Sequence, residues 1–203
     1  MPTTQTHQGK RSAILAAAEK LFDAKGYTAT TIEEVASAAG VAKGSVYTYF
    51  RSKEELFEQV FVNAVADIET QVFDIFAQPI SAAEKLQRLV DYRFATMDQT
   101  KPIGRLVLEF WATAAREQQG RLAAVLVKMY GRWRDQVAAV LNEGDVAGEF
   151  GREFNTPAGA ALIVAVLDGI EVEALLGYGP ELDQEYRDAL KRAILTALAT
   201  GRS

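Results

Sequence analysis

The chain contains no cysteine and only one histidine, His7, which lies in a polar leading stretch. Disulfides, thiolate metal sites and cysteine nucleophiles are therefore excluded, and histidine-based metal or acid–base sites are effectively excluded too. No charge-free run has the length of a membrane span, and the N-terminus lacks a signal-peptide pattern. These absences predict a soluble, cytoplasmic protein without a metal or cofactor and without a membrane partner.

Strand-like alternation, internal repeats and low-complexity segments are also missing. Hydrophobic residues make up 49% of the 203 positions, enough for a sizeable core. Helical periodicity fills most of the chain, which predicts an all-α fold of about nine helices. We expect a small three-helix head over residues 1–54 and a larger helical domain over residues 55–203.

The most informative stretch covers residues 30–53. Two short helical patterns lie on either side of Gly40, a residue that reaches the left-handed backbone region needed in a tight turn. Ala36, Gly40 and Val46 stand at the small, turn and apolar positions of a helix-turn-helix. The second helix can then present its outer face to a DNA major groove. That face carries Lys43, Ser45, Tyr47 and Thr48.

The charge of this stretch fits DNA. Residues 35–53 contain Lys43, Arg51 and Lys53 and no acid. Two short helices around a glycine are common in helical domains, and alone they would indicate nothing more. Combined with a capping box at each end of the stretch and the acid-free window, they favour DNA binding.

The run from about Lys10 to Leu56 resembles the DNA-binding head of TetR-type transcriptional regulators. The matching residues are Ile14, Ala17, Phe22, Gly26, Tyr27, Thr31, Ile32, Ala36, Gly40, Val41, Gly44, Val46, Tyr47, Tyr49, Phe50, Lys53, Leu56 and Phe57. One departure is Tyr49, where histidine is frequent in the family, but a tyrosine hydroxyl can still donate to a phosphate.

The resemblance implies two kinds of DNA contact. Thr31, Tyr47, Tyr49 and Lys53 would anchor phosphates, whereas Lys43, Gly44, Ser45 and Thr48 would lie nearest the base edges. Lys43 is the best candidate for guanine O6 and N7, with a phosphate contact as an equal alternative.

Net charge is distributed unevenly along the chain. Residues 1–60 hold seven Lys/Arg and seven Asp/Glu, so the remaining fifteen cations and twenty acids account for the whole net charge of −5. An acidic body behind a head with a local basic face would orient the molecule on DNA. The body is therefore expected to bind something other than nucleic acid.

A small-molecule cavity in the body is implied by the same resemblance. Its candidate lining residues are Phe76, Tyr92, Phe94, Met97, Glu109, Phe110, Trp111, Met129, Tyr130, Trp133 and Asp168. Core packing is the alternative for each of the apolar ones. Glu109 and Asp168 lie among apolar neighbours, where a buried carboxylate needs a partner. A cationic or hydroxylated ligand would supply one, and pairing across a dimer is the alternative for Asp168.

Residues 158–167 are apolar on every side of a helix that begins at Thr156 and Pro157, so this helix must be covered all round. We interpret it and the last helix as a homodimer interface that completes a four-helix bundle, with the central helix of a monomer core as the alternative. Helix-turn-helix heads usually act as two-fold pairs, and the resemblance also implies dimerisation here. The candidate interface residues are Ala161, Ala165, Asp168, Val172, Tyr186, Leu190, Ala193 and Ala197.

These patterns predict a ligand-responsive transcriptional regulator rather than an enzyme. By the resemblance it would be a repressor that binds a palindromic double-stranded operator as a homodimer and is released by an unknown small molecule. A long helix over residues 52–77 would link head and body and transmit the ligand signal. The alternatives are a helical protein-interaction adaptor and a carboxylate-dependent helical enzyme.

Overall fold

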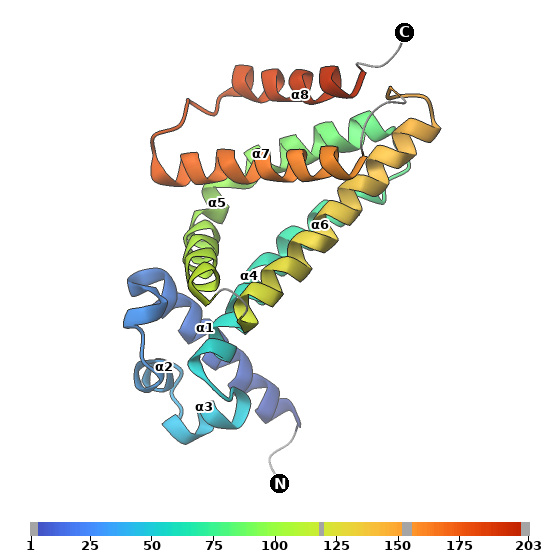
Figure 1. Cartoon of the computed structure of the whole chain (residues 1–203). Helices are drawn as coiled ribbons and strands as arrows, with labels where there is room; N and C mark the ends of the chain where they lie inside the picture. Colours follow the sequence, from blue (N-terminus) through green and yellow to red (C-terminus); the bar gives the residue numbers. More distant parts are fainter. Residues whose placement is uncertain (1–3, 118–119, 152–155, 200–203) are drawn as a thin grey trace. The chain divides into compact units, whose positions relative to one another are not determined.

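The computed structural model describes residues 4–117, 120–151 and 156–199. Every regular element within these ranges is a helix, which confirms the all-α class (Figure 1). The elements are α1 (Thr4–Ala29), α2 (Ile32–Ala38), α3 (Lys43–Tyr49), α4 (Lys53–Phe76), α5 (Ala82–Glu117), α6 (Arg121–Val146), α7 (Thr156–Leu176) and α8 (Gln184–Ala199).

Two residues of types that often end a helix lie inside helices here. Gly26, with φ 85° and ψ 162°, divides α1 by a kink. Pro102 lies inside α5, which continues on both sides of it. Met97 before the proline and Leu106 after it are both buried, so packing on either side keeps the helix continuous despite the lost backbone hydrogen bond.

The chain divides into two compact units, the first containing residues 1–66 and 105–126. Its core is aromatic and centres on Phe57 of α4. The Phe57 ring lies 5.1 Å from that of Phe22, 4.4 Å from that of Tyr27 and 5.2 Å from that of Phe110. Phe110 of α5 also stacks on Phe61 with 3.9 Å between ring centres. This cluster joins α1, through Phe22 and Tyr27, to α4 and α5.

The second unit contains residues 67–104 and 127–203. Its core joins the remainder of α4, α5 and α6 with α7 and α8, through buried side chains such as Val72, Leu89, Val137, Ile163 and Leu198. Polar contacts fix the helix ends. Glu149 accepts hydrogen bonds from the first backbone amides of α5, at Ala82 and Ala83 (3.2 and 2.9 Å). The chain before α7 is tied to α8 by a backbone bond from Gly151 to Leu198 (2.8 Å).

The boundary between the two compact units does not fall at one point of the chain. Residues 55–66 of α4 and 105–117 of α5 group with the head because Phe57, Phe61 and Phe110 pack there. The first unit therefore takes in the first half of α4, the last third of α5 and the start of α6, in addition to α1, α2 and α3.

Candidate functional site

The helix-turn-helix is built by local signals in the sequence. The Thr31 hydroxyl accepts from the Glu34 amide (3.3 Å) and the Glu34 carboxylate accepts from the Thr31 amide (2.9 Å), which is the capping box that opens α2. Gly40 turns the chain with φ 67°. Val46 of α3 is fully buried, so α3 is fixed with the opposite side of the helix outward.

The outward side of α3 gathers most of the residues proposed to contact DNA. Lys43, Gly44, Tyr47 and Thr48 are exposed, and Tyr47 shows 48% of its surface. Ser45 and Tyr49 are half-buried beside them, and the Tyr49 hydroxyl lies 3.0 Å from His7 Nδ1. No acid lies within α3, so this face offers hydroxyl and ammonium donors to a polyanion.

Lys43 forms an ion pair with Glu33 of α2. This pairing raises the pKa of Lys43 and lowers the pKa of Glu33. Both side chains are more than half exposed, so the ion pair contributes little to stability. Lys43 can therefore exchange Glu33 for a nucleic-acid oxygen at small cost.

Lys53 has a structural role that the sequence did not indicate. Its ammonium donates to the carbonyls of Tyr27 (2.8 Å), Thr28 (3.2 Å) and Thr30 (3.0 Å), and it lies 4.5 Å from the centre of the Tyr27 ring. These carbonyls belong to the end of α1 and the turn that follows, where a cation is favoured. Burial lowers the pKa of Lys53. Its expected phosphate contact thus competes with a capping role inside the head.

Glu109, Phe110 and Trp111 lie in the first unit and not among the residues that line the cavity described below. Glu109 Oε1 accepts a hydrogen bond from the Tyr27 backbone N–H at 2.5 Å. Phe110 is fully buried in the aromatic cluster. This part of α5 therefore packs on α1 and α4 within the first unit.

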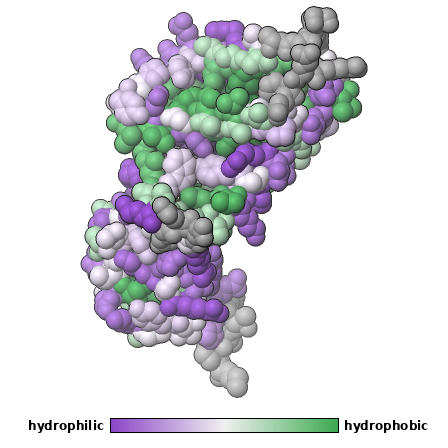
Figure 2. Space-filling view, in the orientation of Figure 1, coloured by the Kyte–Doolittle hydropathy of each residue, from purple (hydrophilic) through white to green (hydrophobic). Residues whose placement is uncertain are grey.

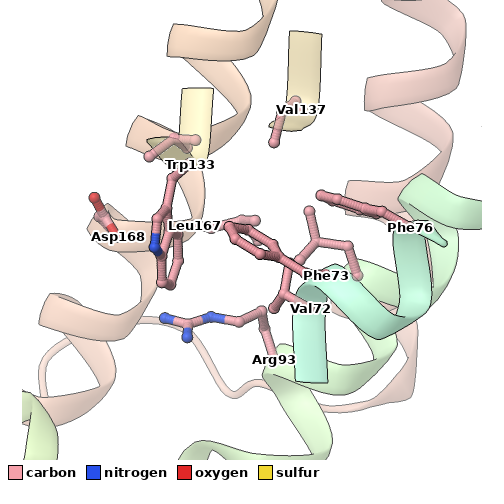
Figure 3. A pocket seen from close by; sticks show the side chains of 10 residues that line it. Val72, Phe73, Phe76, Arg93, Trp133, Val137, Leu167 and Asp168 are labelled. Atoms are coloured by element: carbon pink, nitrogen blue, oxygen red, sulfur yellow. The ribbon is translucent and has the colours of Figure 1, made fainter. Parts of the chain in front are cut away.

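A cavity lies within the second unit, between α4, α5, α6 and α7. With the side chains as they lie in this structure, its volume is about 20 Å3. Figure 3 shows Phe73, Phe76 and Val137 at one end, and Arg93, Trp133 and Asp168 at the other. The remaining lining residues are Val72, Leu89, Val164 and Leu167. The cavity is therefore apolar with one polar end.

The other proposed cavity residues take different places in the second unit. Met97 lines a second, shallower hollow with Thr100 and Leu175. Tyr92, Phe94 and Tyr130 pack against the core, and Met129 is buried. Phe76, Trp133 and Asp168 are thus the predicted residues that the structure brings together at the cavity.

Arg93 was missed in the sequence, although one signal was present. It follows Leu89 by four residues and precedes Met97 by four, so a charged side chain occupies a position on the apolar face of its helix. The Arg93 side chain is 5% exposed and its Nη2 pairs with Glu171 Oε2. Its guanidinium carbon lies 5.9 Å from the centre of the Trp133 ring.

The charge of Arg93 acts on two carboxylates, those of Asp168 and Glu171. Burial raises the pKa of Asp168 to about 6, although a hydrogen bond with Tyr130 and the charge of Arg93 oppose the shift. Burial likewise raises the pKa of Glu171, against its ion pair with Arg93. The polar end of the cavity is therefore lined by one cation, Arg93, and one acid, Asp168, and Glu171 pairs with the same guanidinium.

The proposed dimer residues separate into two groups. Ala165, Ala193 and Ala197 are exposed, and Ala161 and Val172 are half-buried. Asp168 lines the cavity, Leu190 packs on the core, and the Tyr186 ring stacks at 6.2 Å from that of Phe94. Large apolar side chains on α7 are also exposed, Leu162 by 64% and Val166 by 42%. Figure 2 shows hydrophobic surface where α7 and α8 lie.

The described residues contain no group of three or more acidic or histidine side chains placed to hold a metal ion. None of the described helices combines the length and the apolar character needed to cross a bilayer.

Two family models match the chain. Residues 14–60 match the model of bacterial regulatory proteins of the tetR family, and residues 82–199 match that of the C-terminal part of BetI-type transcriptional repressors. The first range holds the helix-turn-helix, and the second holds α5 to α8.

Individual proteins agree with the family models. The transcriptional regulator YfiR of Bacillus subtilis is 30% identical over 149 residues, which span 72% of this chain and 71% of that protein. The regulator YhgD of the same organism is 35% identical, but the match spans only 39% of this chain and 41% of YhgD.

A solved structure extends the likeness to the whole fold. The transcriptional regulator FadR from Bacillus subtilis, in complex with stearoyl-CoA, superposes with a TM-score of 0.74 at 20% identity, covering 95% of this chain and 99% of that one. At this identity the match shows the fold alone. With one family model over the helix-turn-helix and another over more than half of its length, the chain belongs to the TetR family of DNA-binding transcriptional regulators.

Proposed function

We propose that this TetR-family regulator is a cytoplasmic, homodimeric repressor that binds a palindromic operator and is released by a small molecule bound in its second unit. The observation that carries the proposal is the outward face of α3. It presents Lys43, Tyr47 and Thr48 to solvent, with no acid in the helix. The repressor sense is supported by the BetI-type repressor model that matches residues 82–199.

Contacts with DNA divide by chemistry. Tyr47 and Tyr49 carry hydroxyls that donate to phosphate oxygens and set the register of α3 on the duplex. Lys43, Ser45 and Thr48 reach base edges, and Gly44 lets the backbone approach. Thr31 lies at the start of α2 and carries a hydroxyl that can donate to a phosphate oxygen.

A homodimer is supported by the exposed surface of α7 and α8. Leu162, Ala165 and Val166 form an exposed apolar stretch of α7, and Ala193 and Ala197 give α8 a small apolar face. A second copy of these two helices would cover this surface in a four-helix bundle. Two heads would then meet a two-fold operator with half-sites one helical turn, or a multiple of it, apart.

Release would follow from population shift. DNA selects one arrangement of the paired heads, and a ligand in the cavity selects another. Helices α4 and α5 each contribute residues to both units, so both are candidates for carrying the signal. Arg93 at the cavity and Glu109 at the end of α1 belong to the same helix, α5.

The test begins with an operator selected from random duplexes by the purified protein. Binding of the selected duplex is measured by fluorescence anisotropy over a range of salt concentrations. Lys43→Ala is compared with Lys128→Ala, which removes the same charge from an exposed position of α6 in the second unit. We expect Lys43→Ala to lower affinity and to change the salt slope by about one contact, whereas Lys128→Ala leaves both near wild type.

Two outcomes would contradict the proposal. A protein that enriches no duplex sequence, even at low salt, is not an operator-binding regulator. Equal effects of Lys43→Ala and Lys128→Ala would show that net charge, and not the face of α3, determines binding.

A further inference from the structure

The polar end of the cavity holds two buried donors that have no hydrogen-bond partner among the described residues. They are Arg93 Nε and Trp133 Nε1. Figure 3 shows the Trp133 indole nitrogen and the Arg93 guanidinium at the same end of the cavity, next to Asp168. Buried donors are normally satisfied, so this pair indicates an oxygen acceptor between them.

Charge restricts which acceptor can fit. The guanidinium of Arg93 is already paired with Glu171, and Asp168 adds a second carboxylate at the same end. Among the residues that the structure describes, Arg93 is the cation that lowers the pKa of both acids. A carboxylate or phosphate head would add a third negative charge beside one cation. An ammonium head could pair with these carboxylates, but it has no acceptor atom and would leave Arg93 Nε and Trp133 Nε1 without a partner.

An uncharged oxygen can accept hydrogen bonds from both donors and adds no negative charge to this end of the cavity. A hydroxyl accepts from Arg93 Nε and Trp133 Nε1 and donates its own proton to the Asp168 carboxylate. The rest of the cavity wall is made of aliphatic and aromatic side chains that suit an apolar body, among them Phe73, Phe76 and Leu167.

We propose that the effector is an uncharged amphipathic molecule, an apolar body bearing a hydroxyl or carbonyl oxygen that is held by Arg93 and Trp133. This inference rests on the proposed function, because it assigns a chemical class to the ligand that releases the operator. The proposed ligand class does not require that the ligand change operator binding. Ligand binding and operator binding are therefore measured in separate experiments.

The test compares three probes with the same body and different heads, namely n-octanol, n-octanoate and n-octylamine. Binding to the full chain is measured at pH 7.5 by isothermal titration calorimetry. We expect n-octanol to bind tightest. Trp133→Phe keeps an aromatic ring and removes the indole donor, so it should weaken n-octanol binding roughly threefold to tenfold while the other two probes change little. Trp111→Phe, a change of the other tryptophan in the first unit, is the matched control.

A second variant guards against misfolding of Trp133→Phe. Asp168→Asn removes one of the two carboxylates and keeps an acceptor oxygen, so n-octanoate should gain affinity relative to n-octanol. Tighter binding of n-octylamine or n-octanoate to the wild-type protein would overturn the proposal in favour of a cationic or an acidic ligand. The absence of binding by all three probes would also overturn it.

Operator binding is measured separately with the selected duplex. Selective n-octanol binding without loss of operator affinity would support the ligand class and contradict ligand-driven release. Operator binding by a protein that takes up none of the probes would contradict the ligand class and leave the DNA-binding function in place.

Discussion

Glu109 of α5 accepts a hydrogen bond from the backbone N–H of Tyr27 at 2.5 Å, although 82 residues separate them in the chain. Tyr27 directly follows the kink at Gly26, where α1 cannot satisfy its own amides in the regular way. Glu109 therefore supplies the acceptor that the kink leaves missing. The carbonyl of the same residue, Tyr27, accepts from Lys53 at 2.8 Å.

The first prediction concerns Glu109. Glu109→Ala leaves the partly buried Tyr27 amide without its acceptor and should lower the free energy of unfolding by roughly 1–3 kcal/mol. Glu109→Gln keeps a carbonyl oxygen and should recover most of that loss. Urea unfolding followed by circular dichroism measures both, with Glu19→Ala on the exposed side of α1 as a control near zero. A loss of equal size in the Ala and Gln variants would mean that charge, not the hydrogen bond, is what Glu109 provides.

The second prediction compares the replacement of two glycines by alanine. Gly26→Ala adds a methyl carbon 2.9 Å from Glu109 Oε1 at a residue with φ 85°, and should destabilise the protein by at least about 1–3 kcal/mol. Gly131→Ala lies within helix α6 with open space around the added carbon, and should stabilise it by about 0.5–1 kcal/mol. Thermal unfolding of the two variants should therefore move in opposite directions. An unchanged unfolding temperature of Gly26→Ala would show that the kink does not require a glycine.

A third prediction separates the two lysines of the head. Lys53→Met removes three hydrogen bonds from one ammonium to carbonyls at the end of α1, so it should lower the free energy of unfolding by roughly 1.5–3 kcal/mol. Lys43→Met breaks an exposed ion pair and should change stability by under about 0.5 kcal/mol while weakening DNA binding. Urea unfolding and anisotropy on the same samples distinguish the roles. Normal stability of Lys53→Met would contradict the capping role.

The fourth prediction concerns pH. Because burial raises the pKa of Asp168 to about 6, the folded state holds its proton more tightly than the unfolded state does. The stability from this group is fully present below about pH 4, falls as pH rises toward 6, and is absent above it. Asp168→Asn cannot titrate, so it should be more stable than wild type at pH 7, by at most about 3 kcal/mol, and similar at pH 4.

The measurement is urea unfolding of wild type and Asp168→Asn at several pH values between 4 and 7. The difference between the two proteins is the readout, because Glu171 titrates with a raised pKa in both. A difference that does not change with pH would mean that Asp168 is not desolvated in the native protein.

The fifth prediction tests the proposed dimer. Val166→Asp places a charge on the exposed apolar face of α7 and should weaken dimerisation by about a hundredfold or more, because the charge would be buried in the bundle. Val146→Asp makes the same change at a position of α6 that is 89% exposed and should have no effect. Light scattering after size-exclusion chromatography gives the mass of each variant. A dimeric Val166→Asp protein would place the interface elsewhere.

The sequence predicted the head well because its signals are local. The capping box at Thr31, the turn at Gly40 and the buried Val46 each act within a few residues, and the structure has all three. Lys53 shows the limit of such reasoning. Its carbonyl partners lie 23 to 26 residues earlier in the chain, and spacing within a helix carries no information about them.

Cavity residues were harder to predict because helix periodicity shows which side of a helix is apolar but not which neighbour covers it. Phe76 and Phe110 look alike in the sequence, yet Phe76 lines the cavity and Phe110 lies in the aromatic cluster behind the head. Arg93 was overlooked because its partner Glu171 belongs to another helix, α7, and lies too far along the chain for any local sequence pattern to connect the two.

The chain passes between its two units three times, and each passage lies inside a helix rather than a loop, at residues 66–67 of α4, 104–105 of α5 and 126–127 of α6. These three passages therefore contain no loop. Helix α5 carries Pro102 just before its passage, and proline is a residue at which helices commonly kink. Because the chain passes between the units at three places, cutting one peptide bond cannot separate the first unit from the second.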